Sequence, residues 1–369
     1  MGVKRFVRQG AKSALAGLLD VTGMARLIKG AARKAAGGRR VLIVAFHRVA
    51  EDFEREARQA IPGLIISTEA FEAQLDALHR AGFEVVSLAE ALQILTGERS
   101  ARRDAAVITF DDGYGDVHAH ALPILRRRGL SATVYLASGC IGTNQPFPHD
   151  QLYSLLLRNL YTDAHRMSVP ALGKVSLHCA ALVERLIAGQ SAHTLEALME
   201  ALAARTPPIT EAEAALASEP CSGGRPLTWD EVRAMSRQGI TFGAHTVKHT
   251  VLTHESVEAI EGELTRSKAE IEAETGRAVL DFAYPNGLFD ARVLDILRRL
   301  GFRSAVTTED APNRIGIDPL RLRRKTLWEN TGRGAFGLSE RLARCQLDDL
   351  FGLLSLTQPE RGLRAVPRA

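Results

Sequence analysis

The stretch AVITFDDG, residues 106–113, joins a continuously apolar run to two adjacent carboxylates and a glycine. Such a run predicts a strand that is buried on both faces, as in a parallel sheet covered by helices. Asp111 and Asp112 would then stand at the carboxyl end of that strand, where parallel α/β folds form their sites. One acid could bind a cation while the other stays ionised as a base. Taken alone, however, the motif favours an ordinary Asp-Gly turn.

Five further β-rich runs alternate with helical patterns along the chain. The runs cover residues 41–46, 131–136, 240–244, 280–284 and 304–307. The helical patterns cover residues 69–81, 228–238, 256–274 and 290–300, each with a glycine at or just beyond its end. Thr68 is the expected cap of the first helix, and Thr228 with Glu231 forms a capping box for the second. This alternation predicts an α/β fold whose parallel sheet, of roughly six to eight strands, is either a barrel or open.

One region departs from this alternation. Residues 140–226 lack a strand pattern and predict a loop with helices over 151–161 and 177–205, broken by Pro207-Pro208 and by the segment from Cys221 to Gly224. We expect an insertion at the rim of the sheet, acting as a lid or a substrate platform. The main domain would span 41–330, followed by a C-terminal helical extension over 331–369.

The first 40 residues form a basic leader. They hold ten Lys and Arg against one acid, a formal charge of +9, whereas the whole chain carries only +4. The remaining residues are therefore acidic overall, which disfavours nucleic-acid binding by the domain. Lys12, Asp20 and Arg26 interrupt the apolar stretch, so neither a signal peptide nor a membrane span is predicted. Two interpretations stay open: an amphipathic helix resting on an anionic membrane surface, or a solvated tail. The first places the protein in the cytoplasm, peripheral to the inner membrane.

The four cysteines, Cys140, Cys179, Cys221 and Cys345, lie far apart and form no CxxC pair. This spacing predicts buried, reduced thiols and excludes a zinc knuckle or a thioredoxin-like motif.

Two histidines follow another expected strand end. His245 and His249 come directly after the run 240–244, and their spacing of four residues would place both imidazoles on one face of a helical turn. Alone, the pair is a weak signal. Joined by Asp112 and an open position for water, two histidines and a carboxylate describe a catalytic zinc site. The same set also fits non-haem iron.

Two further segments stand at predicted strand ends. Tyr284-Pro285-Asn286-Gly287 predicts a tight turn whose backbone N–H groups could hold an oxyanion, although a plain turn is equally consistent. His47 ends the run 41–46, where a lone histidine is commonly buried and neutral. The histidines of the insertion, His149 among them, receive no role.

Three motifs in order carry a family resemblance. TFDDG at 109–113, HTVKHTVLT at 245–253 and YPNG at 284–287 resemble the first three motifs of the polysaccharide deacetylases, the NodB homology domain of carbohydrate esterase family four. The resemblance spans residues 41–330, interrupted by the insertion. It implies a distorted (β/α) barrel of about seven strands and one divalent metal ion, usually zinc.

The resemblance also implies roles for individual residues. By motif matching, Asp112, His245 and His249 would bind the metal, and Asp111 would be the general base. The ion would lower the pKa of its water to about 7 and polarise the acetyl carbonyl. A backbone N–H near Asn286, beside Tyr284, would help to stabilise the oxyanion.

Two departures from the family pattern affect the mechanism. Ala283 stands where the third motif usually has arginine, so the base is expected to lack its customary partner. No histidine follows His254, so the late histidine that usually serves as general acid is missing. In relatives with a circularly shifted motif order, the first strand ends in Tyr-His. Phe46-His47 is similar, which makes His47 the candidate acid.

The layout resembles bacterial deacetylases associated with exopolysaccharide or lipid-linked sugar assembly. It predicts a metal-dependent hydrolase that removes acetyl groups, N-acetyl first, from an amino-sugar polysaccharide or a lipid-linked glycan. Three alternatives stay open: an O-acetyl esterase, another metal-dependent amidase, and a catalytically decayed sugar-binding relative. The sequence leaves the exact glycan, the metal and the oligomeric state open.

Overall fold

The computed structural model describes residues 14–19, 21–24, 27–28, 39–160, 169–206, 224–334 and 337–349. Most of the predicted leader, the breaks at Pro207-Pro208 and Cys221, and residues 350–369 of the predicted extension lie outside the described residues. Cys140, Cys179 and Cys345 are buried free thiols, as predicted.

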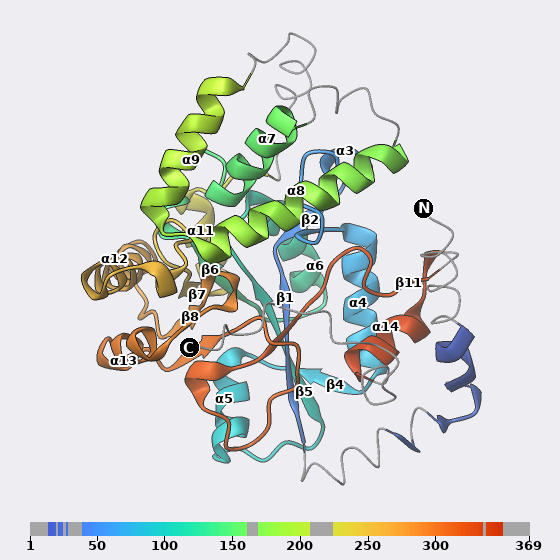
Figure 1. Cartoon of the computed structure of the whole chain (residues 1–369). Helices are drawn as coiled ribbons and strands as arrows, with labels where there is room; N and C mark the ends of the chain where they lie inside the picture. Colours follow the sequence, from blue (N-terminus) through green and yellow to red (C-terminus); the bar gives the residue numbers. More distant parts are fainter. Residues whose placement is uncertain are drawn as a thin grey trace, which may run out of the picture.

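A parallel sheet forms the centre of the molecule (Figure 1). At one edge of this sheet lies strand β9 (Ser304–Val306), and at the other lies β10 (Arg324–Thr326). A parallel bridge joins Val306 of β9 to Leu322, which leads into β10, so the sheet is a nearly closed barrel. The predicted barrel is therefore correct, and the open sheet is excluded. The strands follow the order β10 (Arg324–Thr326), β1 (Val41–Phe46), β5 (Asp104–Phe110), β6 (Thr133–Leu136), β7 (Thr241–Ala244), β8 (Asp281–Ala283) and β9 (Ser304–Val306), with β4 (Phe83–Val85) paired to β5.

All six predicted strands are present, but β4 and β10 were not predicted. β10 has the sequence Arg-Lys-Thr, which lacks the apolar run that identifies a buried strand. Its position is set by pairing with β1, where Ile43 lies opposite Arg324. Tertiary pairing thus makes a strand from a segment without strand character of its own.

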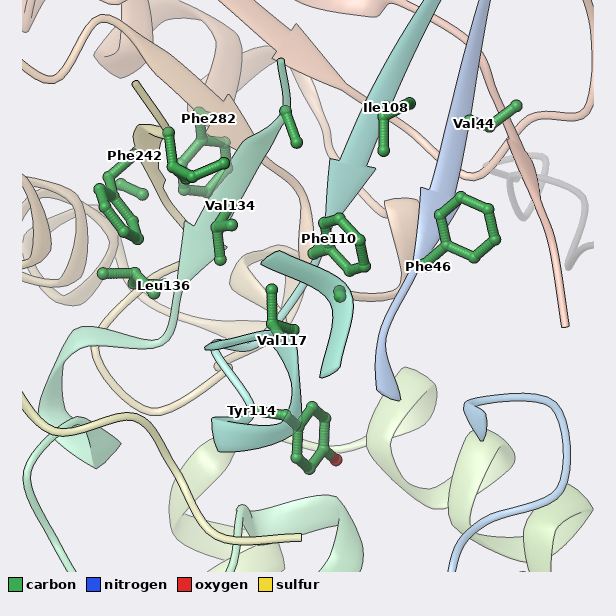
Figure 2. Close-up of a cluster of buried hydrophobic side chains, with 14 of the residues drawn as sticks. Val44, Phe46, Ile108, Phe110, Tyr114, Val117, Val134, Leu136, Phe242 and Phe282 are labelled. Carbon is green, nitrogen blue, oxygen red and sulfur yellow. The ribbon is translucent and has the colours of Figure 1, made fainter. Parts of the chain in front are cut away.

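Alternate residues of each strand face opposite sides of the sheet. One set packs beneath the outer helices and includes Phe46, Ile108, Phe110, Val134 and Phe282 (Figure 2). The other set forms a second cluster with residues of α5 (Leu88–Thr96), and its strand members are Val41, Ile43, Ala105, Val107, Tyr135, Ala283 and Val306.

The second set continues past the strand ends into polar residues. His47 follows the alternation of Val41 and Ile43, and Asp111 follows that of Ala105 and Val107. The same alternation directs functional side chains from different strands toward the barrel interior. Gly243, two residues before His245, is required there because a Cβ would lie 2.5 Å from the ring of Tyr135.

Helices surround the barrel close to their predicted positions. α4 (Thr68–Arg80) is capped by Ser67, not by the predicted Thr68, because Thr68 is already helical and the Ser67 hydroxyl accepts from the Ala70 N–H at 3.1 Å. α11 (Trp229–Arg237) begins with the predicted Thr228–Glu231 capping box. Further elements are β2 (Arg48–Ala50), α3 (Phe53–Glu56), β3 (Ile65–Ser67), α6 (Leu122–Arg127), α12 (Val257–Thr275), α13 (Ala291–Arg299), β11 (Arg333–Gly334), β12 (Gly337–Leu338) and α14 (Glu340–Leu347).

Three helices between β6 and β7 lie over the carboxyl ends of the strands (Figure 1): α7 (Pro148–Leu160), α8 (Val169–Gly189) and α9 (Ala192–Arg205). They pack together through an apolar cluster that also takes in Ile61 and Val251 from the barrel loops. The single helix predicted over 177–205 is in fact divided, because Ser191 caps α9 by accepting a hydrogen bond from the Thr194 N–H.

Leader and C-terminal residues meet on one side of the barrel. Ala16 and Leu19 pack against Leu342 and Cys345 of α14. Among the described residues, no helix is long and apolar enough to cross a membrane.

Candidate active site

Asp112, His245 and His249 come together at the ends of β5 and β7, and we call these three candidate metal ligands the metal cluster. Asp112 Oδ1 lies 3.5 Å from His245 Nε2 and 3.6 Å from His249 Nε2, and the three donor atoms lie within 4.8 Å of one another. Asp112 Oδ1 is buried and lacks a hydrogen-bond partner among the described residues. Two imidazole nitrogens and one carboxylate oxygen at this spacing fit a single divalent ion.

The histidine segment is a turn and not the expected helical turn. Thr246 and His249 have left-handed backbones, with φ of 63° and 59°, a conformation that non-glycine residues adopt at a cost. Side chains of α12 hold this turn in place. Glu263 accepts from the Val247 N–H at 2.7 Å, and the Ser267 hydroxyl donates to the Thr246 carbonyl at 2.9 Å. The fold therefore supports the strained backbone that brings the two imidazoles together.

The protonation states also suit a metal. His245 Nδ1 lies 2.7 Å from the Ala283 carbonyl and donates its hydrogen to it, which leaves the Nε2 lone pair facing Asp112. Burial lowers the pKa of His245, and burial followed by the charge of His245 lowers the pKa of His249 well below its ordinary value. Burial raises the pKa of Asp112 well above its ordinary value, and Asp111 adds to this rise. A cation would reverse the effect on Asp112.

Asp111 has an arginine partner, which corrects the expectation drawn from Ala283. Arg324 of β10 donates to Asp111 Oδ1 and Oδ2, both at 2.7 Å, and the guanidinium is fully buried. The arginine that the resemblance leads one to expect at position 283 is alanine here, and β10 supplies the positive charge from another strand. Burial alone would raise the pKa of Asp111, yet Arg324 outweighs it and lowers the pKa to about 2. Asp111 is thus held ionised and oriented.

His47 also lies beside Asp111, and we call Asp111, Arg324 and His47 the base cluster. His47 Nε2 is 3.9 Å from Asp111 Oδ2. Burial lowers the pKa of His47 to about 4, against the opposing influence of Asp111. The imidazole is therefore neutral near pH 7, and it has to receive a proton before it can act as a general acid.

The YPNG segment forms the expected tight turn. Asn286 has a left-handed φ of 54° and is partly exposed. Gly287 is needed because a Cβ there would lie 2.2 Å from the Thr308 hydroxyl. The Tyr284 hydroxyl donates to the Leu320 carbonyl at 2.8 Å, and its ring is buried against Phe289. This hydrogen bond uses the only hydrogen of the Tyr284 hydroxyl. The predicted oxyanion role would therefore fall to a backbone N–H of this turn.

Besides Arg324, the sequence analysis did not predict two residues of the site, His149 and Tyr114. His149 of α7 lies 3.7 Å from Asp112 Oδ2, and Tyr114 lies 2.6 Å from His149 Nε2. Tyr114 follows the first motif directly, which was the available signal. His149 follows no strand, so nothing in the local pattern placed it at the carboxyl edge.

Comparison with known proteins assigns the chain to a family. The model of the polysaccharide deacetylase family matches residues 98–305, more than half of the chain. The chain therefore belongs to the polysaccharide deacetylase family. It is 28% identical over 102 residues to "Putative polysaccharide deacetylase YxkH" of Bacillus subtilis, a match that covers 28% of this chain and 37% of that protein.

Solved structures share the fold. The Streptococcus pyogenes deacetylase PplD, in complex with acetate, superposes with a TM-score of 0.51 at 19% identity, covering 79% of this chain and 94% of the other. IcaB from Ammonifex degensii superposes with a TM-score of 0.52 at 19% identity, covering 79% and 92%. The barrel is therefore of the NodB type. The family match leaves out β1, which His47 follows, and β10, which carries Arg324.

Proposed function

We propose that this protein is a metal-dependent hydrolase that removes N-acetyl groups from an amino-sugar polysaccharide or a lipid-linked glycan. The observation that carries the proposal is the metal cluster directly beside an ionised, arginine-bound Asp111. Membership of the polysaccharide deacetylase family supports the acetylated glycan as substrate. The deacetylase PplD, which shares the fold, was solved in complex with acetate, and this supports acetate as the product.

The residues divide the chemistry between them. A divalent ion, zinc first, would be held by Asp112, His245 and His249, and when bound it activates water and polarises the acetyl carbonyl. Asp111 takes the proton of the attacking water, because Arg324 keeps its carboxylate ionised and fixes its direction. A backbone N–H of the turn at Asn286 donates to the developing oxyanion.

His47 is the proposed acid. Cleavage of the C–N bond releases acetate and an amine, and the amine requires one proton to leave. Since His47 is neutral near pH 7, the proton that Asp111 has accepted is the natural source, and Asp111 lies 3.9 Å from His47 Nε2. The imidazole would relay this proton to the amine.

We also propose roles for the parts outside the barrel edge. The position of α7–α9 over the strand ends supports residues 140–226 as a substrate platform inserted in a domain of 41–330, with 331–369 as an extension.

The leader is proposed to contact an anionic membrane surface on the cytoplasmic side. Leu18, Val21 and Leu27 are 61%, 76% and 68% exposed, although Leu19 is buried against α14. These apolar side chains, together with the +9 charge of residues 1–40, suit an interfacial helix. Deletion of residues 1–40 should abolish flotation with anionic vesicles at low salt. Unchanged flotation would reject the proposal.

Acetate release from a panel of N- and O-acetylated glycans, with and without chelator, tests the main proposal. We expect chelator-sensitive release from N-acetylated amino-sugar oligomers. Asp111→Asn should keep the metal and lose about 10²–10⁴ in rate, the usual contribution of general acid–base catalysis, while the exposed Asp310→Asn serves as control. Release from O-acetylated glycans alone would indicate an esterase, and a metal-loaded protein that releases no acetate would indicate a decayed relative.

A further inference from the structure

Helix α7 carries a histidine into the site from outside the barrel. His149 Nε2 lies 3.7 Å from Asp112 Oδ2, whereas His245 and His249 both face the other oxygen, Oδ1. The ring centroids of His149 and His249 are 5.0 Å apart, and the His149 side chain is buried. His149 therefore contacts both segments of the metal cluster although it belongs to neither.

Tyr114 and Asp150 determine which nitrogen of His149 carries hydrogen. The Tyr114 hydroxyl donates to Asp150 Oδ2 at 2.7 Å and lies 2.6 Å from His149 Nε2. A phenol has one hydrogen, so with that hydrogen donated to Asp150, Nε2 must donate to the Tyr114 oxygen. The protonated, positive edge of the imidazole is thus the edge that faces Asp112.

This direction of hydrogen bonding decides between two roles. A ring nitrogen that carries hydrogen has no lone pair for a metal, so His149 Nε2 is not arranged as a fourth ligand. His245 shows the opposite arrangement, with its hydrogen on Nδ1 and the Nε2 lone pair facing Asp112. What His149 offers is a positive edge beside the Asp112 oxygen that the ligand histidines do not face.

Packing holds His149 in this position. Its ring stacks on Phe147, with centroids 5.7 Å apart and an interplanar angle of 7°. Phe147 in turn packs edge-on against Tyr114 at 4.5 Å, and the Arg48 guanidinium lies 5.5 Å from the Tyr114 ring. Because Tyr114 is two residues from Asp112, the start of α7 is docked on the segment that carries the candidate ligand.

We propose that His149 is a positioning residue that, through Tyr114 and Asp150, orients the Asp112 carboxylate and so couples docking of helix α7 to the metal site. This inference rests on the proposed metal-dependent function. It differs from the roles implied by the motifs because both His149 and Asp150 belong to the inserted helices.

Metal affinity of the full-length chain tests the inference without relying on activity. Zn²⁺ affinity is measured by competition with a chromophoric chelator, and the ligand field is monitored by Co²⁺ absorption. His149→Ala and Tyr114→Phe should each weaken Zn²⁺ binding by about 10–100-fold, the range found for residues that orient ligands. His149→Gln should recover part of the loss, because its amide can still donate. The exposed His193→Ala on α9 is the matched control and should bind as the parent does.

The outcomes separate this inference from the proposed function. Unchanged affinity in His149→Ala, in a parent that binds metal and releases acetate, overturns the inference alone. A loss in His149→Ala with no loss in Tyr114→Phe would make His149 a direct ligand, which also overturns it. A parent that binds no metal rejects both. If His149→Ala fails to fold, Tyr114→Phe, which removes a single oxygen, carries the test.

Discussion

The metal cluster and the base cluster share one edge of the barrel but are assembled differently. All three members of the metal cluster follow β5 or β7, within the residues 98–305 that match the family. In the base cluster only Asp111 lies in that range. His47 follows β1 and Arg324 belongs to β10, and these two strands pair with each other beside β5.

The two clusters differ in how far a sequence motif can identify their members. The metal cluster depends on short spacings within segments, so its members can be recognised by sequence. The base cluster requires a positive charge beside the Asp111 carboxylate. Any strand with a side chain that faces the barrel interior there can supply this charge. In this chain position 283 is alanine, and Arg324 of β10 keeps Asp111 ionised.

The largest expected effect comes from removing a candidate metal ligand. His249→Ala should reduce the bound metal from about one equivalent per chain to near zero and bring deacetylation to background. Elemental analysis of protein purified without chelator checks this, with His254→Ala, which contacts the Ala188 carbonyl, as control. If His249→Ala still binds about one equivalent of metal, His249 is not a metal ligand.

Breaking the base cluster should act on stability and pH dependence while leaving the metal bound. Arg324→Met leaves the buried Asp111 carboxylate unpaired and should lower the free energy of unfolding by about 3–5 kcal/mol. Urea denaturation checks this value, with the neighbouring Arg323→Met, whose side chain is 41% exposed and pairs with Glu309, as control.

The pH dependence of the same variant has a defined sign. The pKa of Asp111 is lowered from 3.8 to about 2, so its contribution to stability is complete above pH 3.8 and is lost as pH falls toward 2. Without Arg324, burial acts alone and raises this pKa, which should move the acid limb of kcat/KM to higher pH. An unmoved acid limb would mean that Asp111 is not the titrating base.

His47 tests whether the base cluster also delivers a proton. His47→Asn should bind metal normally and hydrolyse an N-acetyl substrate about 10²-fold more slowly. An acetyl ester with a good leaving group should lose much less, because that group departs without protonation. Steady-state rates on the two substrates give the comparison, and equal losses would favour a structural role.

The smallest effect is expected from the support behind the metal cluster. Ser267→Ala removes the hydroxyl that donates to the Thr246 carbonyl, at a cost of about 1 kcal/mol in stability. Zn²⁺ affinity should fall by about tenfold, since the left-handed turn between the two histidines is less firmly held. A larger loss than that of His149→Ala would make α12, and not α7, the main support.

Much of the barrel was predictable because local patterns report it directly. Continuous apolar runs identified six strands, and the Thr228–Glu231 capping box marked the start of α11 correctly. The cap of α4 was misplaced by one residue, because Ser67 and Thr68 are both capable caps and only backbone geometry distinguishes them. The helices of the insertion were found, but not the contact between His149 and Asp112.

By itself, the sequence determined the alternation of strands and helices, the acidic pair at the end of β5 and the histidine pair at the end of β7, since each depends on residues close together in the chain. Only the tertiary structure decided that the sheet closes, that Arg324 replaces the missing arginine, and that His149 reaches Asp112. These contacts join residues 213 and 37 positions apart, as the numbering of Asp111–Arg324 and Asp112–His149 shows. Over such separations no local pattern fixes which side chains meet, because pairing of strands and docking of helices set the final distances.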